Sequence, residues 1–408
     1  MSRSKVLALA VAILLLAQAT PADEHGHFMS FSTEDFWEDQ AIRPAGGLYY
    51  NRVDGLLFYA GVEYRSEEHL HPRLIAQRGW SSARAANHYQ IEVEQPLFGQ
   101  ESFSFGVQFY DMTDWPRSDA QGLSDVENNL LALFFRQEFR SYYRRDGYAV
   151  FVQQHLTPEL TFRLEHRDDR LSSLPTRQSV WSAFRRSLKW EENPPLEVGI
   201  LDAADEFEGT MKGYYATIEY DNREPTRGHG WYARGFFEVY GTGLLDVRGW
   251  SLFGGESDSG GGGDYDFRKY ELDVRRSFGL TETQSLDLRG VWGIGSGTDF
   301  ASHKLFYLGG PGTLRGYDYR EFSGKNVLFG SAEYRVRIRP ELEMIYFVDS
   351  GQAWYGTSGF DSKETRHDIG IGFRLDAPAA GDLRVDIARP ATTQEADIVV
   401  QVRLAYPS

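Results

Sequence analysis

One glycine-rich stretch of the sequence has residue types that could bind phosphate. Residues 309–317 read GGPGTLRGY, with a single cation among four glycines. From Gly310 the spacing is G-x-G-x-x-x-G, which is one residue too long for the dinucleotide fingerprint, and no GK[ST] follows. The pattern therefore argues against a nucleotide loop. A flexible external loop is the plainer alternative, but Leu314 and Tyr317 flanking Arg315 are unusual for a solvated tip.

The other candidates for chemistry are weaker. Two histidine pairs, His25 with His27 and His69 with His71, have metal-ligand spacing, but neither pair has an obvious third ligand. The chain has no cysteine, so neither a thiolate nucleophile nor a disulfide framework is available. No nucleophile, histidine and orienting group can be assembled from spacing. We therefore expect no enzyme activity, no metal and no cofactor.

Composition limits the class of protein that could position these residues. The net charge of −16 argues against nucleic acid as a partner. Aromatic residues make up 14% of the chain, yet the mean hydropathy is only −0.46. Many aromatic residues with a low average hydropathy suit a membrane barrel, whose strands are apolar on one face only.

The N-terminus has the pattern of a secretory signal peptide. A basic start precedes the charge-free run 6–17, and small residues suited to cleavage follow up to Ala22. The run is too short to span a bilayer, and no later stretch is long and apolar enough for a transmembrane helix. We expect a signal peptide at 1–22, in preference to a buried N-terminal helix, then a short periplasmic segment at 23–54.

Period-two alternation dominates the rest of the chain. In 55–65 one face is Leu56, Phe58, Ala60, Val62 and Tyr64, and the other includes Glu63 and Arg65. Strands are predicted at 55–65, 72–82, 87–97, 102–111, 128–137, 147–156, 158–168, 211–222, 229–240, 266–277, 284–296, 326–338, 342–353, 367–376, 381–388 and 396–406. Segment 128–137 could equally be helical. An even number of strands of this length predicts an all-β, 16-stranded antiparallel transmembrane β-barrel over 55–408.

The lengths of the connections favour a barrel over a large sandwich. If the first strand runs outward, the connections 157, 223–228, 278–283, 339–341 and 377–380 are short periplasmic turns. The long connections, 169–210, 241–265 and 297–325, then all lie outside. Two connections break the pattern: 112–127 is long on the periplasmic side, and 98–101 is short on the external side.

A longer segment around the glycine-rich stretch resembles a known family. Residues 308–335, LGGPGTLRGYDYREFSGKNVLFGSAEYR, are similar to the signature of the BamA/TamA superfamily, the bacterial surface antigen proteins. Segments 221–230 and 370–390 support the resemblance. It implies a 16-stranded outer-membrane barrel that inserts or translocates polypeptides. It also implies that the sixth external loop, between strands eleven and twelve, folds into the lumen.

The resemblance assigns partners to the arginine of this loop. The loop-six motif comprises Gly309, Gly310, Leu314, Arg315, Gly316 and Tyr317. Arg315 is expected to pair with Glu333 and Asp349 on the inner wall, and the alternation independently places both carboxylates on the lumen face. Such a network makes charge-assisted bonds, and it could be either functional or only a structural staple.

Function is less defined than fold. No stretch fits the periplasmic transport repeats of typical members, so the resemblance is to a subgroup that lacks them. We expect location in the bacterial outer membrane, with its lipid and periplasmic or barrel-assembly proteins as candidate partners. Three functions are open: insertion or translocation of polypeptide or lipid at the seam between the first and last strands, a structural or anchoring barrel, and a passive pore.

Overall fold

The computed structural model describes most of the barrel. The described residues are 41–65, 72–97, 102–116, 123–184, 187–196, 208–224, 229–241, 265–356, 359–376, 382–391 and 397–405. The expected signal peptide and both histidine pairs lie outside the described residues.

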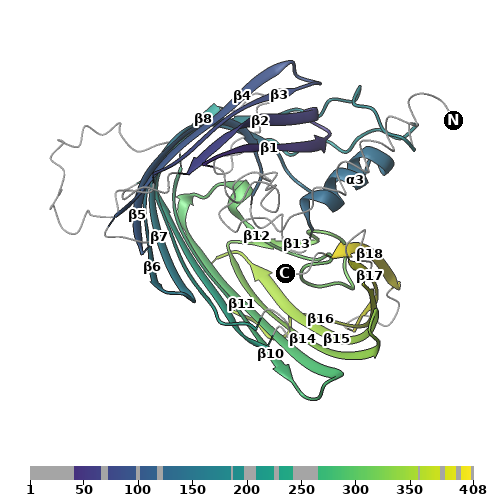
Figure 1. The fold of residues 1–408 in the computed structure, drawn as a ribbon. Helices are drawn as coiled ribbons and strands as arrows, with labels where there is room; N and C mark the ends of the chain where they lie inside the picture. The colour runs from purple at the N-terminus through teal and green to yellow at the C-terminus, as the bar shows by residue number, and fades with distance from the viewer. Residues whose placement is uncertain are drawn as a thin grey trace.

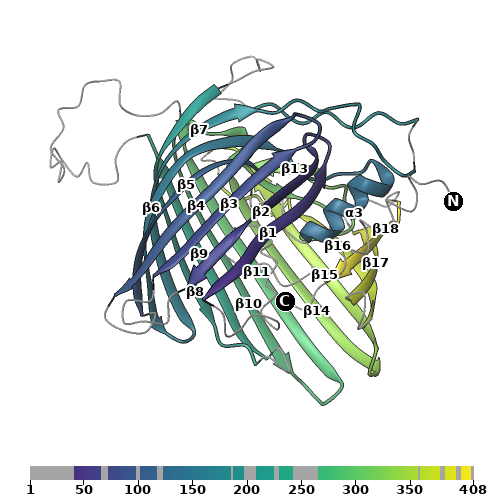
Figure 2. The same ribbon diagram turned by 45° about the horizontal axis from the view of Figure 1, so that its top comes forward.

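Sixteen strands form a single antiparallel sheet, which rolls into a barrel (Figures 1 and 2). Each strand pairs with the next along the chain, so the order ends at β1 on one side and at β18 on the other. The strands are β1 (Ile42–Asn51), β2 (Gly55–Arg65), β3 (Arg73–Ser81), β4 (Ala86–Leu97), β5 (Phe103–Asp114), β6 (Tyr143–Thr157), β7 (Leu160–Ser173), β8 (Glu208–Asp221), β9 (Gly230–Tyr240), β10 (Asp266–Gly279), β11 (Gln284–Asp299), β14 (Asn326–Arg339), β15 (Leu342–Trp354), β16 (Arg366–Leu375), β17 (Asp382–Pro390) and β18 (Val399–Ala405).

Two of the sequence expectations are wrong, and they offset each other in the count. Segment 128–137 belongs largely to a helix, α3 (Asp125–Phe135), because Ser124 and Glu127 form a capping box that starts it. The first strand, β1, lies inside the segment 23–54 that was expected to precede the barrel, so the boundary at 54/55 is wrong. Pro44, Gly46 and Gly47 hide this strand, since all three are poor strand formers.

The corrected strand order removes both breaks in the pattern of connections. With β1 running outward, the short connection between β4 and β5 falls on the periplasmic side. The long segment 115–142 between β5 and β6, which contains α3, becomes an external loop. From β6 onward the strand numbering is unchanged, so residues 300–325 still form the sixth external loop.

The two faces of the sheet differ as the alternation predicts. On β2, Phe58 is 40% exposed, whereas the neighbouring Tyr59 is 3% exposed. Leu328 and Phe329 on β14 show the same contrast. The outward side chains form an apolar surface around the sheet, as lipid requires, and the inward face contains most of the buried polar and charged side chains of the strands. Among the described residues, no helix is long and apolar enough to cross a membrane.

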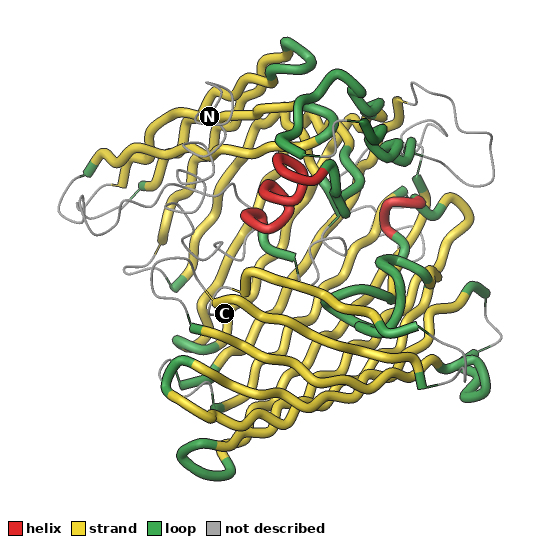
Figure 3. The backbone as a smooth tube through the Cα atoms, turned by 90° about the vertical axis from the view of Figure 1, so that its right-hand side faces the viewer, coloured by secondary structure: helices red, strands yellow, loops and turns green. Residues whose placement is uncertain are grey.

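Loop six lies against the inner face of the sheet, and α3 lies between the two end strands. A short hairpin, β12 (Phe306–Leu308) with β13 (Phe322–Gly324), brackets residues 309–321 and packs against β14 and β15. Helix α3 contacts both end strands, β1 and β18 (Figure 3). The site is therefore built where loop six meets the inner wall.

Candidate functional site

The glycines at the start of the loop-six motif set a compact turn. Gly309 and Gly310 have φ values of +112° and +93°, which side-chain-bearing residues rarely adopt. The Thr313 hydroxyl accepts a hydrogen bond from the Gly309 N–H at 2.9 Å, and the Gly310 N–H donates to Leu314 O at 3.1 Å. The segment is therefore folded on itself and presents Arg315 to the barrel wall.

Arg315 meets both of its expected partners. Its guanidinium donates two bonds of 2.7 Å to the two oxygens of Asp349, and its Nη1 donates to Glu333. Arg315 is 4% exposed and Asp349 is fully buried. Burial opposes the charge, but the bonds to Asp349 and the charge of Glu333 hold the pKa of Arg315 above its ordinary value. The loop is thus joined to β14 and β15 by a bidentate buried ion pair.

Further residues that the sequence analysis did not name complete this network. Arg315 also donates to Ser331, at 3.3 Å, and its guanidinium stacks over Phe347, 3.5 Å from the ring centroid. Glu333 is shared with Arg384 of β17, whose Nη2 lies 2.8 Å from it. Each of these residues lies on the inward face of its strand, so the alternation that located Glu333 could also have located them.

Gly316 occupies a position with no room for a side chain. A Cβ there would lie 2.7 Å from the Cβ of Asp368 and 2.9 Å from the backbone nitrogen of Pro390. The neighbouring Leu314 is fully buried, and the Tyr317 hydroxyl donates to His367 O at 3.3 Å. The LRGY tetrad therefore fits closely against β16 and β17. Gly316 is needed for this close packing, and not for binding phosphate.

Side chains from the wall also hold the backbone of loop six. Arg289 of β11 donates to Gly312 O at 2.9 Å. On the last strand, β18, Gln401 donates to Arg315 O at 3.0 Å and Arg403 donates to Pro311 O at 3.2 Å. One loop thus connects strands from β11 to β18 across the interior.

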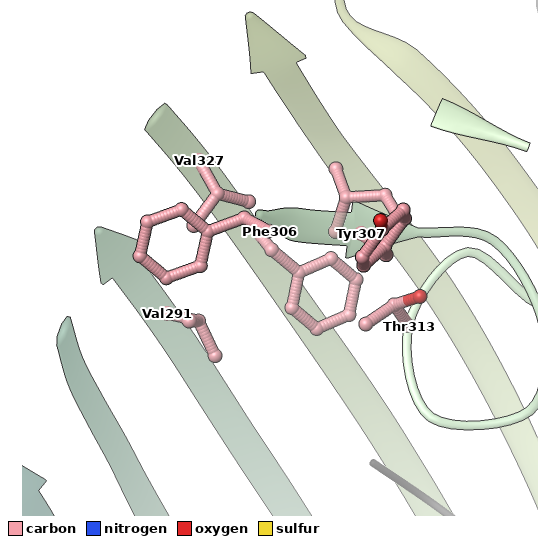
Figure 4. Close-up of a pocket in the computed structure, with 7 residues that line it drawn as sticks. Val291, Phe306, Tyr307, Thr313 and Val327 are labelled. Carbon is pink, nitrogen blue, oxygen red and sulfur yellow. The ribbon is translucent and has the colours of Figure 1, made fainter. Parts of the chain in front are cut away.

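The hairpin at the base of loop six rests on an apolar part of the wall. Phe306 and Leu308 pack with Val291, Val327 and Phe329 around a small pocket (Figure 4). A ligand-sized polar site is not formed there. Within the described residues, no three histidine or carboxylate side chains come together as metal ligands. The contacts around this hairpin hold loop six against the wall.

The fold and the site together define a β-barrel whose interior contains a loop fixed by a buried arginine. The description "Omp85 superfamily domain" belongs to the family model that matches residues 76–404. The chain therefore belongs to the Omp85 superfamily. No curated protein matches the chain.

Two solved structures illustrate what the chain is similar to. BamA from Haemophilus ducreyi lacking POTRA domains 1–3 matches with a TM-score of 0.55 at 15% identity, covering 89% of this chain and 69% of that one. CdiB from Acinetobacter baumannii matches with a TM-score of 0.44 at 12% identity, covering 89% of this chain and 59% of that one. At these identities the BamA match shows a shared barrel fold and nothing finer.

Proposed function

We propose that this protein is a non-enzymatic barrel of the bacterial outer membrane that inserts or translocates polypeptide. Membership of the Omp85 superfamily and the BamA-like fold support this proposal. The route is the seam, defined as the junction between the end strands β1 and β18. The strand pair proposed from the sequence, 55–65 with 396–406, is corrected accordingly, since β1 precedes 55–65.

The observation that carries the proposal is the unequal fixing of the two end strands. Loop six bonds to β18 through Gln401 and Arg403, and the same loop is bonded to β14 and β15 through Arg315. The β18 side is therefore braced from within. The turn after β1 makes its contacts with a different segment, since the Arg52 N–H donates to Glu138 at 2.8 Å. A barrel built this way can part at the seam while Arg315 keeps loop six on β14 and β15.

Crosslinking across the seam tests the proposal. Because the chain has no cysteine, Leu48→Cys on β1 and Val402→Cys on β18 would be the only thiols, to be joined by a bifunctional thiol reagent. The matched control joins Val402→Cys to Val385→Cys, its direct partner on β17. The assay is the rate at which an unfolded outer-membrane barrel protein folds into lipid vesicles containing each variant.

We expect the seam crosslink to abolish the acceleration of folding and the control crosslink to leave it intact. Full activity of the seam-crosslinked protein would contradict the proposed route. A large, stable conductance in planar bilayers, from the protein without substitutions, would instead favour a passive pore. Capture of a specific periplasmic partner, without any effect on folding, would favour an anchoring barrel.

A further inference from the structure

Helix α3 bonds to the edge of β1 that faces away from β2. The Asn129 side chain accepts from the Tyr50 N–H at 3.0 Å and donates to Leu48 O at 3.4 Å. Ala41 O accepts a hydrogen bond from the Arg65 N–H of β2. The backbone N–H and C=O groups of the odd-numbered residues of β1 therefore point toward β2, and those of the even-numbered residues point to the free edge of the sheet. The Asn129 carboxamide therefore forms hydrogen bonds with two backbone groups of β1 that a neighbouring strand would otherwise bind.

The rest of the free edge of β1 also has features that prevent another strand from pairing with it. Pro44 is also even-numbered, so the N–H that it lacks would have pointed to the outer edge. Tyr50 also donates its hydroxyl to Trp181 O, and Ala132 and Leu133 of α3 pack with it in one apolar cluster. Edge strands offer a template for any extended polypeptide, and a helix laid over the edge prevents such pairing.

The other side of α3 faces the last strand. Arg403 of β18 lies 3.9 Å from a carboxylate oxygen of Glu127, which is 4% exposed. The same arginine donates to Pro311 O of loop six. Arg403 therefore stands between loop six and α3. With Asn129 on β1 and Glu127 near β18, the helix bridges the two strands of the seam.

The position of α3 along the seam is fixed by local contacts. The Asp125 carboxylate is 2.6 Å from Arg140, and Asn128 donates to Glu138 at 3.2 Å. The segment after the helix reaches loop six, because Arg320 donates to Ser141 at 2.7 Å and Phe139 packs on Tyr319 at 4.7 Å. These contacts make the helix a specific cover of the seam rather than a loop that happens to lie near it.

We propose that α3 blocks the seam and must leave the edge of β1 before an extended polypeptide can pair there. The incoming strand competes with Asn129 for the Tyr50 N–H and Leu48 O, and release also separates Glu127 from Arg403. This regulation rests on the proposed function, since it concerns the same route. It assigns a control role to the external loop between β5 and β6, which contains α3.

The first test weakens the block. Asn129→Ala removes both bonds to β1, and Glu127→Gln removes the charge facing Arg403 while a glutamine can still complete the capping box. Gln137→Ala, at an exposed position just past the helix, is the matched control. Hydrogen exchange of the β1 peptide reports on the edge. We expect about tenfold faster exchange at Tyr50 in Asn129→Ala, since the bond that protects the Tyr50 N–H is lost.

The second test fixes the block in place. Leu48→Cys and Ala132→Cys belong to one apolar cluster, so a thiol crosslink between them holds α3 on β1. We expect the crosslinked protein to lose folding activity and the reduced protein to regain it, while Glu127→Gln folds the substrate faster than the unsubstituted protein. Retained activity in the crosslinked form, or unchanged exchange in Asn129→Ala, would overturn the block. If the seam crosslink still abolishes activity in that case, the proposed function stands without it. Migration on electrophoresis before and after heating confirms that each variant is folded.

Discussion

Removing the Arg315 side chain tests whether loop six is fixed by the ion pair or merely lies near it. Arg315→Ala deletes both bonds to Asp349 and the bond to Glu333. Asp349 is fully buried, so its charge would remain without this partner, whereas Glu333 keeps Arg384 and Arg335. Breaking a buried ion pair on one side costs about 3–5 kcal/mol, and most of that should come from Asp349.

A double-mutant cycle gives this prediction its sharpest form. Arg315→Ala should lower the free energy of unfolding by about 3–5 kcal/mol, whereas Asp349→Ala should cost less, because Arg315 keeps Glu333. The double variant should cost less than the sum of the two single variants. Arg315→Lys should fall between, because an ammonium cannot make the bidentate pair. Arg335→Ala is the control: Arg335 is 30% exposed, so its loss should cost no more than about 1 kcal/mol. Urea titration followed by electrophoretic mobility measures each value. Strictly additive costs for Arg315 and Asp349 would refute the pairing.

Two further predictions concern residues of loop six. Gly316→Ala should destabilise the protein by about 1–3 kcal/mol, because its Cβ would collide with Asp368, whereas Gly330→Ala meets only an atom 3.9 Å away and should be tolerated; urea titration distinguishes them. Burial, with the charges of Lys304 and Lys269, holds the pKa of His303 well below its ordinary value, so the unfolded chain takes up this proton more readily. Stability should therefore be full above about pH 6.5 and fall as the pH drops, and His303→Phe should lessen that fall in melting experiments between pH 7 and 5.

Much of the fold could be predicted from the sequence, because a sheet between lipid and a polar interior imposes strict alternation. Strand 55–65 was predicted to the residue, and the strands from 147 onward were located within a few residues. The exceptions have local causes. β1 is weakened as a signal by Pro44 and two glycines. The apolar run in α3 has no clear period, but the Ser124 and Glu127 spacing was a helix signal that was not used.

Strand periodicity also explains which parts of the candidate site could be predicted from the sequence. Glu333 and Asp349 could be placed on the lumen face because strand periodicity fixes which way a side chain points. Their pairing with Arg315 came from the family resemblance. Alternation alone cannot say how a loop folds, and residues 315 and 349 are far apart in the sequence. The bond between Asn129 and β1 could not be predicted at all, since it joins a loop helix to a strand that the alternation did not reveal.

The contacts of Arg403 link loop six to α3. This side chain donates to loop six and faces α3, so any movement of α3 away from β18 changes the surroundings of an arginine that also holds loop six. Leaving a buried charge without a partner costs free energy. Arg403→Met should therefore loosen both elements together, giving faster exchange in the α3 peptide and in the loop-six peptide of one variant. Faster exchange in only one of the two would show that loop six and the seam are independent.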